Sequence, residues 1–352
     1  MVVCPRGTMP FHVSGKKVTI IALCIIFLVG ISFVVGFWYF LNSPNKKGGP
    51  DQVFFIRGGL SLKEIVDELE KKEIISNKNL FLLWARLMGY SRDIKAGEYR
   101  LSSGMTPLKI LKIINEGTII TYPVTIPEGF TKNEIGETLE RKGVVDKSKF
   151  LLLAEDPKIA RRYDISGPGL EGYLYPDTYY FGKDLSPMSV IDVMVKRFFE
   201  VFASFQERVE QLGMTLEEVV IIASIVEKET GRAEERPVIA SVFLNRLKKG
   251  MRLESDPTVI YGIRDFNGNL TRKDLSHPTP YNTYVIRGLP PGPIANPGKE
   301  AIKAVLYPAN SDYLYFVSKK DGSHYFSKTL SEHNQAVEIY QKKRRIKHRE
   351  IS

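Results

Sequence analysis

The chain has few residues that could cross-link it or hold a metal ion. Among 352 residues there are two cysteines, Cys4 and Cys24, and both lie in or before the first apolar run. No disulfide is therefore expected in the rest of the chain. Histidine and cysteine form no cluster with the spacing of a ligand set, so we expect neither a metal site nor a cofactor.

The chain also lacks a broad excess of basic charge. Its net charge is +10, and three basic residues with no acid precede residue 42, so the remainder carries +7. Six of these basic residues crowd the C-terminal tail, which leaves the body near +1. A nucleic-acid-binding surface is therefore not expected. The basic tail, 341–352, is either a solvated helix end or a contact for anionic polymer or lipid head groups.

Charged residues are absent from Val18 to Leu41, a run of 24 residues. At 1.5 Å per residue, a helix of this length spans a bilayer with some tilt, and Trp38–Phe40 fit an interfacial aromatic belt. A signal peptide is the competing interpretation, but the run is too long and no small-x-small cleavage site follows it. The pattern predicts an uncleaved anchor. The short tail 1–17 is easier to leave on the inner side than the long remainder.

An internal repeat follows a short linker, residues 42–50. The segment Phe55–Leu83 aligns with Thr125–Leu153 at an offset of 70 residues. Each copy predicts a short strand, an amphipathic helix and a second helix. Each first helix opens with a capping box, Ser61-x-x-Glu64 in one copy and Thr131-x-x-Glu134 in the other.

The first copy continues into a predicted strand at 97–101 and a helix at 106–115. Residues 51–120 should therefore form a small α/β module. Two copies are too few for a solenoid. A spacer and a binding module are both compatible with this pattern.

A buried helix is predicted from Thr215 to Gly231. Thr215 and Glu218 form a capping box, and residues 216–226 are apolar on nearly every side. Gly231 is expected to end the helix.

Two acids lie in the last turn of this helix, Glu227 and Glu229. The residues three, four and seven positions before Glu229 are all apolar, whereas those before Glu227 include a serine. Glu229 also lies at the negative end of the helix dipole. Both effects favour the protonated carboxyl that a general acid needs near neutral pH. The alternative is an ordinary glutamate that ends a helix and points to water.

Aromatic residues gather in Glu171–Phe181, which holds five of them together with two acids. Aromatic faces beside carboxylates suit sugar rings, because the apolar faces stack and the hydroxyls donate hydrogen bonds. A buried strand pair with tyrosine hydroxyls is the alternative. A long amphipathic helix is predicted from Met188 to Leu212.

Loops and short elements are predicted after the central helix. Pro237 can begin a helix that ends at Gly250. Segments 255–262 and 277–298 are expected to form loops, and the apolar residues of the second favour an ordered binding loop. A hairpin is predicted over 313–327, followed by a final helix capped by Thr329.

Several motifs together resemble the endolytic murein transglycosylases of the YceG-like (MltG) family. They are ASIVEKET, IASVFLNRL, GMRLESDPTVIYG, PYNTY and GLPPGPIANPG. The resemblance implies an α+β protein with one N-terminal transmembrane helix. It also implies a LysM-like module at 51–120 and a lysozyme-like catalytic domain of mixed α/β structure at 121–340. Residues 121–156 of that domain would repeat the first part of the module.

The resemblance implies that Glu229, the second glutamate of EKET, is the catalytic acid. It implies cleavage of β-1,4 bonds between N-acetylmuramic acid and N-acetylglucosamine inside glycan strands. Hydrolytic glycosidases use two carboxylates, and the motifs offer no second acid of comparable placement, since Asp256 fits a turn or cap. One glutamate suffices for lytic cleavage, in which the sugar's own C6 hydroxyl attacks C1 and leaves a 1,6-anhydro end.

The groove near Glu229 should be lined by aromatics and amides, because a glycan alternates polar rims with apolar sugar faces. The candidates for substrate binding are Tyr175, Asn245, Tyr261, Tyr281, Asn282 and Tyr284. A hydrolytic muramidase and a wall-binding scaffold without activity remain the alternative functions.

The expected location is the cytoplasmic membrane, with a single pass and the catalytic domain outside. An extended linker at 42–50 would reach at most about 30 Å, so the enzyme would meet nascent glycan strands. The expected partners are these strands and peptidoglycan synthases, the penicillin-binding proteins.

Overall fold

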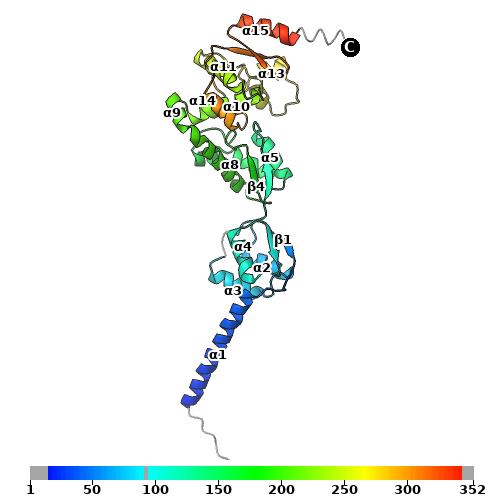
Figure 1. Cartoon of the computed structure of the whole chain (residues 1–352), viewed down its shortest axis with the longest axis vertical. Coiled ribbons are helices and arrows are strands. Elements are labelled where there is room, and N and C mark those ends of the chain that lie inside the picture. The colour runs from blue at the N-terminus through cyan, green and yellow to red at the C-terminus, as the bar shows by residue number, and fades with distance from the viewer. Residues whose placement is uncertain (1–14, 91–93, 343–352) are drawn as a thin grey trace, which may run out of the picture. The chain divides into compact units, whose positions relative to one another are not determined.

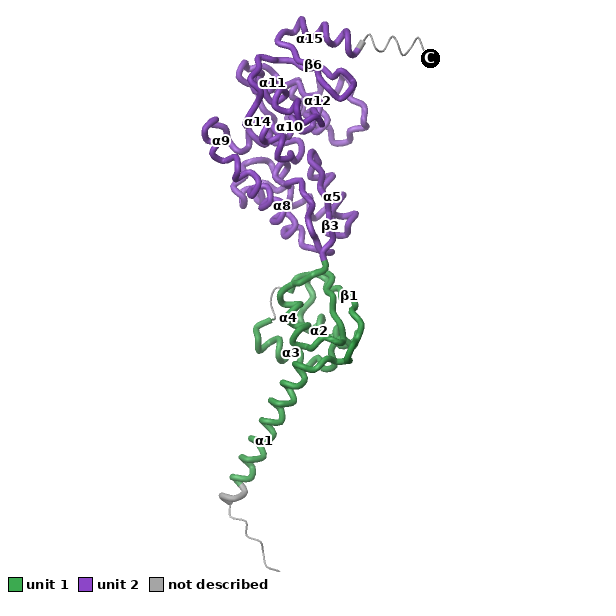
Figure 2. Tube along the Cα trace, in the orientation of Figure 1, with its two compact units in different colours: residues 1–120 green, residues 121–352 purple. Residues whose placement is uncertain are grey.

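The computed structural model describes residues 15–90 and 94–342 (Figure 1). Most of the predicted inner tail, 1–17, and of the basic tail, 341–352, lies outside these residues. The chain divides into two compact units, Met1–Ile120 and Thr121–Ser352 (Figure 2). Helices and strands occur in both units, which confirms the mixed α and β character. The strands of the described residues form three separate two-stranded antiparallel sheets.

The N-terminal apolar run forms a single helix, α1 (Gly15–Asn42). Its segment Thr19–Asn42 is long and apolar enough to cross a membrane, with a mean hydropathy of 3.0. Residues 19–36 of this helix are exposed. From Phe37 onward the helix packs on the rest of unit 1, and the Phe37 ring meets the Trp84 ring edge-on at 5.8 Å.

Residues 42–50 do not form the extended linker expected from the sequence. The Asn45 side chain donates a 2.7 Å hydrogen bond to the Glu73 carbonyl. The Ser102 hydroxyl donates one of 2.5 Å to the Gly49 carbonyl. This segment is therefore folded against unit 1, and the expectation of a free reach of about 30 Å is wrong.

Unit 1 packs three helices and a strand pair around one core. Strand β1 (Asp51–Ile56) pairs antiparallel with β2 (Gly97–Ser102), with Asp51 opposite Ser102. The helices are α2 (Leu62–Lys71), α3 (Lys78–Leu87) and α4 (Pro107–Glu116). The Ser61 capping box is present at the start of α2, as predicted. Buried Phe54, Leu69 and Tyr99 are part of the core.

Unit 2 begins with the same order of elements, so the repeat is longer than its sequence signal. Strand, two helices, strand and helix recur as β3 (Tyr122–Thr125), α5 (Lys132–Arg141), α6 (Lys147–Ala154), β4 (Thr178–Phe181) and α8 (Pro187–Phe202). Strands β3 and β4 pair antiparallel like β1 and β2. The second copy differs in its connection between the second helix and the second strand, because residues 155–177 replace the shorter segment 88–96 and hold α7 (Pro157–Ala160) and the 3-10 turn η1 (Arg161–Tyr163).

Two predicted elements differ in the structure. The helix expected over 188–212 is broken, because α8 ends at Phe202 and the 3-10 turn η2 (Ala203–Phe205) precedes α9 (Gln206–Leu212). The segment expected to be a loop at 255–262 contains helix α12 (Asp256–Gly262). Proline is tolerated in a first turn, and an aspartate there favours the helix dipole. Asp256 and Pro257 therefore start a helix instead of preventing one.

The centre of unit 2 is α10 (Leu216–Glu229), whose residues 219–226 are all buried. It packs against α11 (Arg236–Lys248), α12 and α14 (Lys299–Leu306). The capping box at Thr215 and the core position of the helix are confirmed. Gly231 does not end the helix, because Thr230 already turns to an extended conformation with φ −146°.

The C-terminal part of unit 2 forms a hairpin and short helices. Its strands β5 (Tyr315–Ser318) and β6 (His324–Ser327) confirm the predicted hairpin. The remaining helices are α13 (Arg272–Ser276), α15 (Leu330–Val337) and the π-helical turn η3 (Glu338–Lys342). Segment 277–298 holds no helix or strand, and residues 292–298 are buried. The Ile294 amide donates to the Ser224 hydroxyl of α10 at 3.1 Å, so residues 292–298 of this loop are a packed part of the core.

Candidate active site

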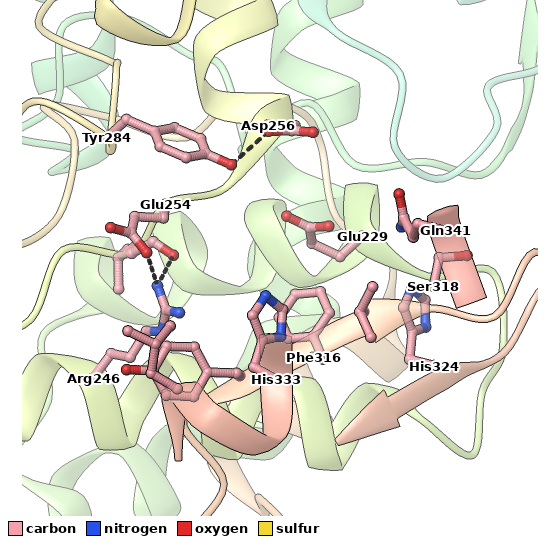
Figure 3. A pocket seen from close by; sticks show the side chains of 14 residues that line it. Glu229, Arg246, Glu254, Asp256, Tyr284, Phe316, Ser318, His324, His333 and Gln341 are labelled. Carbon is pink, nitrogen blue, oxygen red and sulfur yellow. Dashed lines mark hydrogen bonds and ion pairs between the residues drawn. The ribbon is translucent and has the colours of Figure 1, made fainter. Parts of the chain in front are cut away.

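The last residue of α10, Glu229, faces a pocket of about 380 Å³ (Figure 3). Figure 3 shows its side chain between Asp256 on one side and Phe316 and His333 on the other. The remaining walls come from α11, the segment before α12, the loop 277–298, the β5–β6 hairpin, α15 and η3. They include Arg246, Leu253, Glu254, Tyr284, Tyr315, Ser318, His324, Leu330 and Gln341.

The environment of Glu229 favours its protonated form. Burial raises its pKa to about 7, against the hydrogen bond from Ser255, which lowers it, and with a further rise from Asp256. The Ser255 hydroxyl donates to Oε1 of Glu229 at 2.5 Å. A carboxyl with this pKa is partly protonated at neutral pH and can both give and take a proton.

A buried network of hydroxyl groups holds Ser255 in place. Its backbone N–H donates to Oγ1 of Thr283 at 3.0 Å, and its carbonyl accepts from Oγ1 of Thr258 at 2.6 Å. The preceding residue, Glu254, has a left-handed backbone with φ 52°. Such a conformation is strained for a residue with a side chain. The segment that carries Ser255 is therefore fixed by hydrogen bonds in spite of local strain.

One wall of the pocket carries a fixed positive charge. Arg246 is 6% exposed and donates to the Glu254 carboxylate at 3.0 Å and to the Leu314 carbonyl at 2.6 Å. Its guanidinium lies over the Tyr315 ring at 5.0 Å. Burial and Arg246 lower the pKa of His333, so this imidazole is neutral at neutral pH.

The structure also brings the carboxylate of Asp256 into the pocket. Asp256 is exposed and its Oδ1 accepts a 2.7 Å hydrogen bond from the Tyr284 hydroxyl. The sequence interpretation of Asp256 as a residue that starts a turn is compatible with its place at the first position of α12. Its presence in the pocket could not be seen from the motif alone.

The other acid of the last turn, Glu227, has a structural environment. Its side chain is 5% exposed and accepts from Arg236 at 3.0 Å and from the Gly298 amide at 3.0 Å. The Glu227 side chain is thus largely covered, and its negative charge is paired with the Arg236 guanidinium. The two acids are distinguished by their partners more than by the apolar faces that the sequence suggested.

A second cavity of about 690 Å³ opens at the other end of α12. It is lined by Tyr261 and Tyr281, whose rings meet edge-on at 4.8 Å, and by Lys132. The Tyr261 hydroxyl donates at 3.1 Å to Glu171, a buried acid. Burial raises the pKa of Glu171 to about 7 against the opposing effect of Lys132.

Of the six predicted substrate-binding residues, the structure places Tyr284 at the Glu229 pocket and Tyr261 and Tyr281 at the second cavity. The other three line neither of these pockets. Tyr175 is 7% exposed, and Asn245 donates to the carbonyls of Ser311 and Tyr313. Asn282 is fully buried and donates to the carbonyls of Leu275 and His277. The amides of Asn245 and Asn282 are used by the fold, because each holds a loop or a turn in place.

Sequence reasoning missed Ser255, Arg246, His333 and Glu171. Ser255 immediately precedes Asp256 and Glu171 opens the aromatic segment, so both lay inside stretches already singled out. No local signal marks Arg246 or His333, because their place depends on distant segments. Within 15–90 and 94–342, no three His, Cys, Asp or Glu side chains are grouped so that they could hold a metal ion.

The pocket has the features of a general-acid site, with one carboxyl of raised pKa among aromatic and polar walls. Comparison with known proteins gives the family: a model of the YceG-like family matches residues 54–339, and the chain belongs to that family. An endolytic murein transglycosylase of Bacillus subtilis (strain 168) is 32% identical over 330 residues, which cover 89% of this chain and 91% of that protein.

Two further relatives have the same kind of name. An endolytic murein transglycosylase of Streptococcus pneumoniae serotype 2 (strain D39 / NCTC 7466) is 28% identical over 93% of this chain, which covers 65% of that longer protein. The crystal structure of a yceG-like protein from Listeria monocytogenes matches with a TM-score of 0.57 and 37% identity. This match covers 82% of this chain and 100% of the other.

Proposed function

We propose that this protein is an endolytic murein transglycosylase and that Glu229 is its general acid. The observation that carries the proposal is the carboxyl of Glu229, whose pKa burial raises to about 7 in an open pocket. Membership of the YceG-like family and relatives named endolytic murein transglycosylase support the same activity. The substrate is the glycan strand of peptidoglycan.

In the proposed reaction Glu229 first acts as an acid. Its proton goes to the glycosidic oxygen while the bond from that oxygen to C1 of N-acetylmuramic acid breaks. The C6 hydroxyl of the same sugar then attacks C1, and its proton goes to the Glu229 carboxylate. The products are a 1,6-anhydro end and a free N-acetylglucosamine hydroxyl, and Glu229 returns to its starting state. The Ser255 hydroxyl can donate to the carboxylate formed between the two steps.

The second cavity offers a place for more distant sugars. Helix α12 contributes Asp256 to the Glu229 pocket and Tyr261 to the second cavity. We infer that the glycan follows this helix, with sugar faces against Tyr261 and Tyr281. Substitution of Tyr281 by alanine should then raise KM more than it lowers kcat.

The presence of Asp256 near Glu229 favours a second candidate, a hydrolytic muramidase. In that reaction a second carboxylate activates water or attacks C1 itself, and the product has a reducing end. Mass analysis of the ends made by the full-length enzyme from purified glycan separates the two reactions. Anhydro ends that persist in Asp256→Asn support the lytic reaction, whereas reducing ends would contradict it.

The role of Glu229 is tested by the same digestion. We expect Glu229→Gln to abolish cleavage and Glu227→Gln to retain most activity per folded molecule. The two substitutions make the same chemical change two residues apart in one helix. An active Glu229→Gln enzyme would contradict the proposal, and absence of cleavage by the folded wild type would leave a wall-binding scaffold.

The finer architecture is also proposed. Unit 1 after α1 is taken as a LysM-like module and unit 2 as a lysozyme-like catalytic domain, since these assignments rest on the family resemblance. Helix α1 is proposed to anchor the chain in the cytoplasmic membrane with unit 2 outside. Protease added to intact cells, or to spheroplasts where an outer membrane exists, should digest the chain beyond residue 50. Protection of that part would contradict this topology.

Anchoring suggests a role in cutting nascent glycan, with penicillin-binding proteins as neighbours. Because 42–50 is folded onto unit 1, the module stays close to the membrane end of α1. We expect longer glycan strands in cells lacking the gene and poor rescue by a secreted form without residues 1–41. Equal rescue by both forms would show that proximity to the membrane does not direct the enzyme.

A further inference from the structure

Helix α3 has a second apolar face that the core of unit 1 does not cover. Its residues Phe81 and Ala85 are buried in the core. On another face, Leu83 is 39% exposed and Leu87 is 66% exposed, and Met88 directly after the helix is 45% exposed. Residues four apart share one side of a helix. Leu83 and Leu87 are called the α3 apolar face below.

The α3 apolar face lies next to the membrane-spanning candidate. Trp84 lies between Leu83 and Leu87 in the sequence, and its ring contacts Phe37 of α1. Figure 2 shows α3 at the end of unit 1 where α1 enters. Phe40, one turn further along α1, packs against the core of unit 1. Leu83 and Leu87 are thus adjacent to the part of α1, from Phe37 onward, that packs on the rest of unit 1.

The length of α1 determines how deep the contact between Phe37 and Trp84 lies in a bilayer. A hydrocarbon core about 30 Å thick takes about 20 helical residues. A membrane-spanning stretch of about 20 residues that begins at Thr19 ends at Trp38. Trp38 and Tyr39 are 65% and 68% exposed, and aromatic rings of this kind lie at membrane interfaces. The Phe37–Trp84 contact therefore lies at the level of the outer interface.

We propose that the α3 apolar face inserts into the outer lipid interface beside α1, so that unit 1 rests on the membrane surface. The proposal rests on the membrane anchoring put forward under Proposed function. Lipid is the occupant because the face continues the apolar surface of a helix that already crosses the bilayer. Because residues 42–50 are folded against unit 1, they do not form a linker that would let its globular part move away from the membrane surface. Exposed Arg86 in the same helix can extend its charged end to head groups.

The chain provides its own reporters, because its two tryptophans are Trp38 on α1 and Trp84 on α3. The full-length Trp38→Phe chain leaves Trp84 as the single tryptophan, and the Trp84→Phe chain leaves Trp38. Each is placed in lipid nanodiscs, one chain per disc, whose acyl chains carry bromine either near the head group or near the chain end. We expect both tryptophans to be quenched, and Trp84 more strongly by the shallow bromine than by the deep one.

A pair of variants links the quenching to the α3 apolar face. Leu83→Ser with Leu87→Ser should remove most of the quenching of Trp84 and leave that of Trp38 unchanged. The matched control is Leu152→Ser, which changes a leucine that is 72% exposed on α6, the counterpart of α3 in the repeat. It should change neither signal.

Other outcomes would overturn the proposal in distinguishable ways. Quenching of Trp38 without quenching of Trp84 would show that α1 inserts while the α3 apolar face does not. Quenching of neither would refute the anchoring itself, and with it this proposal. Trp84 emission that responds only when two chains share a disc would assign the face to a second copy. Glycan cleavage is measured separately, so its failure bears on the proposed reaction alone.

Discussion

Replacing Glu229 by glutamine should stabilise unit 2 while abolishing catalysis. The wild-type carboxyl has a pKa of about 7 in the folded protein against an ordinary value of 4.5, because burial disfavours its charged form. The unfolded chain ionises this group freely. Above pH 4.5 the folded state thus carries a cost that an uncharged glutamine of the same shape does not have, and Gln can still accept the hydrogen bond from Ser255.

The size of this cost follows from the two pKa values. Between pH 4.5 and 7 the folded state binds more protons than the unfolded state, so wild-type stability falls as pH rises through this range. The difference approaches 2.5 pH units, or about 3 kcal/mol at pH 7 and above, and it is less than about 1 kcal/mol at pH 5. For a domain of this size, about 3 kcal/mol corresponds to a rise in Tm of roughly 6–12 °C.

Thermal unfolding of both full-length proteins at pH 5 and pH 8 measures this effect. Glu227→Gln is the matched control, because it removes one member of the ion pair with Arg236. Arg236 would keep its longer ion pair of 3.7 Å with Glu128, but the loss of the closer charge beside this largely covered guanidinium should lower Tm at both pH values. Equal Tm values for wild type and Glu229→Gln at pH 8 would refute the argument that burial holds Glu229 protonated, even if the variant were inactive.

Three further changes test the surroundings of Glu229 and the fold. Ser255→Ala removes the hydrogen bond that lowers the pKa of Glu229, so the alkaline fall in kcat should move to higher pH; an unmoved pH profile would contradict this role. Asn296→Ala should lower the free energy of unfolding, measured by urea titration, by at least about 2 kcal/mol. The reason is that Oδ1 of Asn296 accepts from two buried amides, one of them that of Gly172, and its Nδ2 donates to Glu171. An unchanged urea midpoint would contradict this structural role of Asn296. Gly172→Ala should be destabilising by the same measure, since its φ is +90° and a Cβ would lie 2.5 Å from Pro293; wild-type stability would show that the loop can shift.

The sequence predicted those elements whose causes are local. The capping boxes at Ser61, Thr131 and Thr215 are each formed by two residues three apart, and each begins a helix in the structure. The β5–β6 hairpin likewise depends on a turn between adjacent strands. The loop expected at 255–262 failed for a local reason too, because Pro257 fits the first turn of a helix as well as it fits a loop.

The composition of the site could be predicted only in part, because most of it depends on contacts between distant segments. Glu229 was singled out from the end of one buried helix. Arg246 and His333 reach the pocket from α11 and α15, and nothing in their own neighbourhoods marks them. Asn282 has the residue type expected of a sugar contact, yet its amide is used by backbone carbonyls. Residue type alone does not tell whether a polar group serves the substrate or the fold.

Two features of the Glu229 pocket are unfavourable for stability. Glu229 is held in a setting that disfavours its charge, and Glu254 two residues before Asp256 has a strained backbone. The surrounding structure offsets both, since α10 is buried along its length and the Thr258 and Thr283 hydroxyls fix Ser255. A fold selected for stability alone would place an uncharged residue at 229. Costs of this kind are typical of functional sites, and they support the proposed role of Glu229 by an argument that does not use the family resemblance.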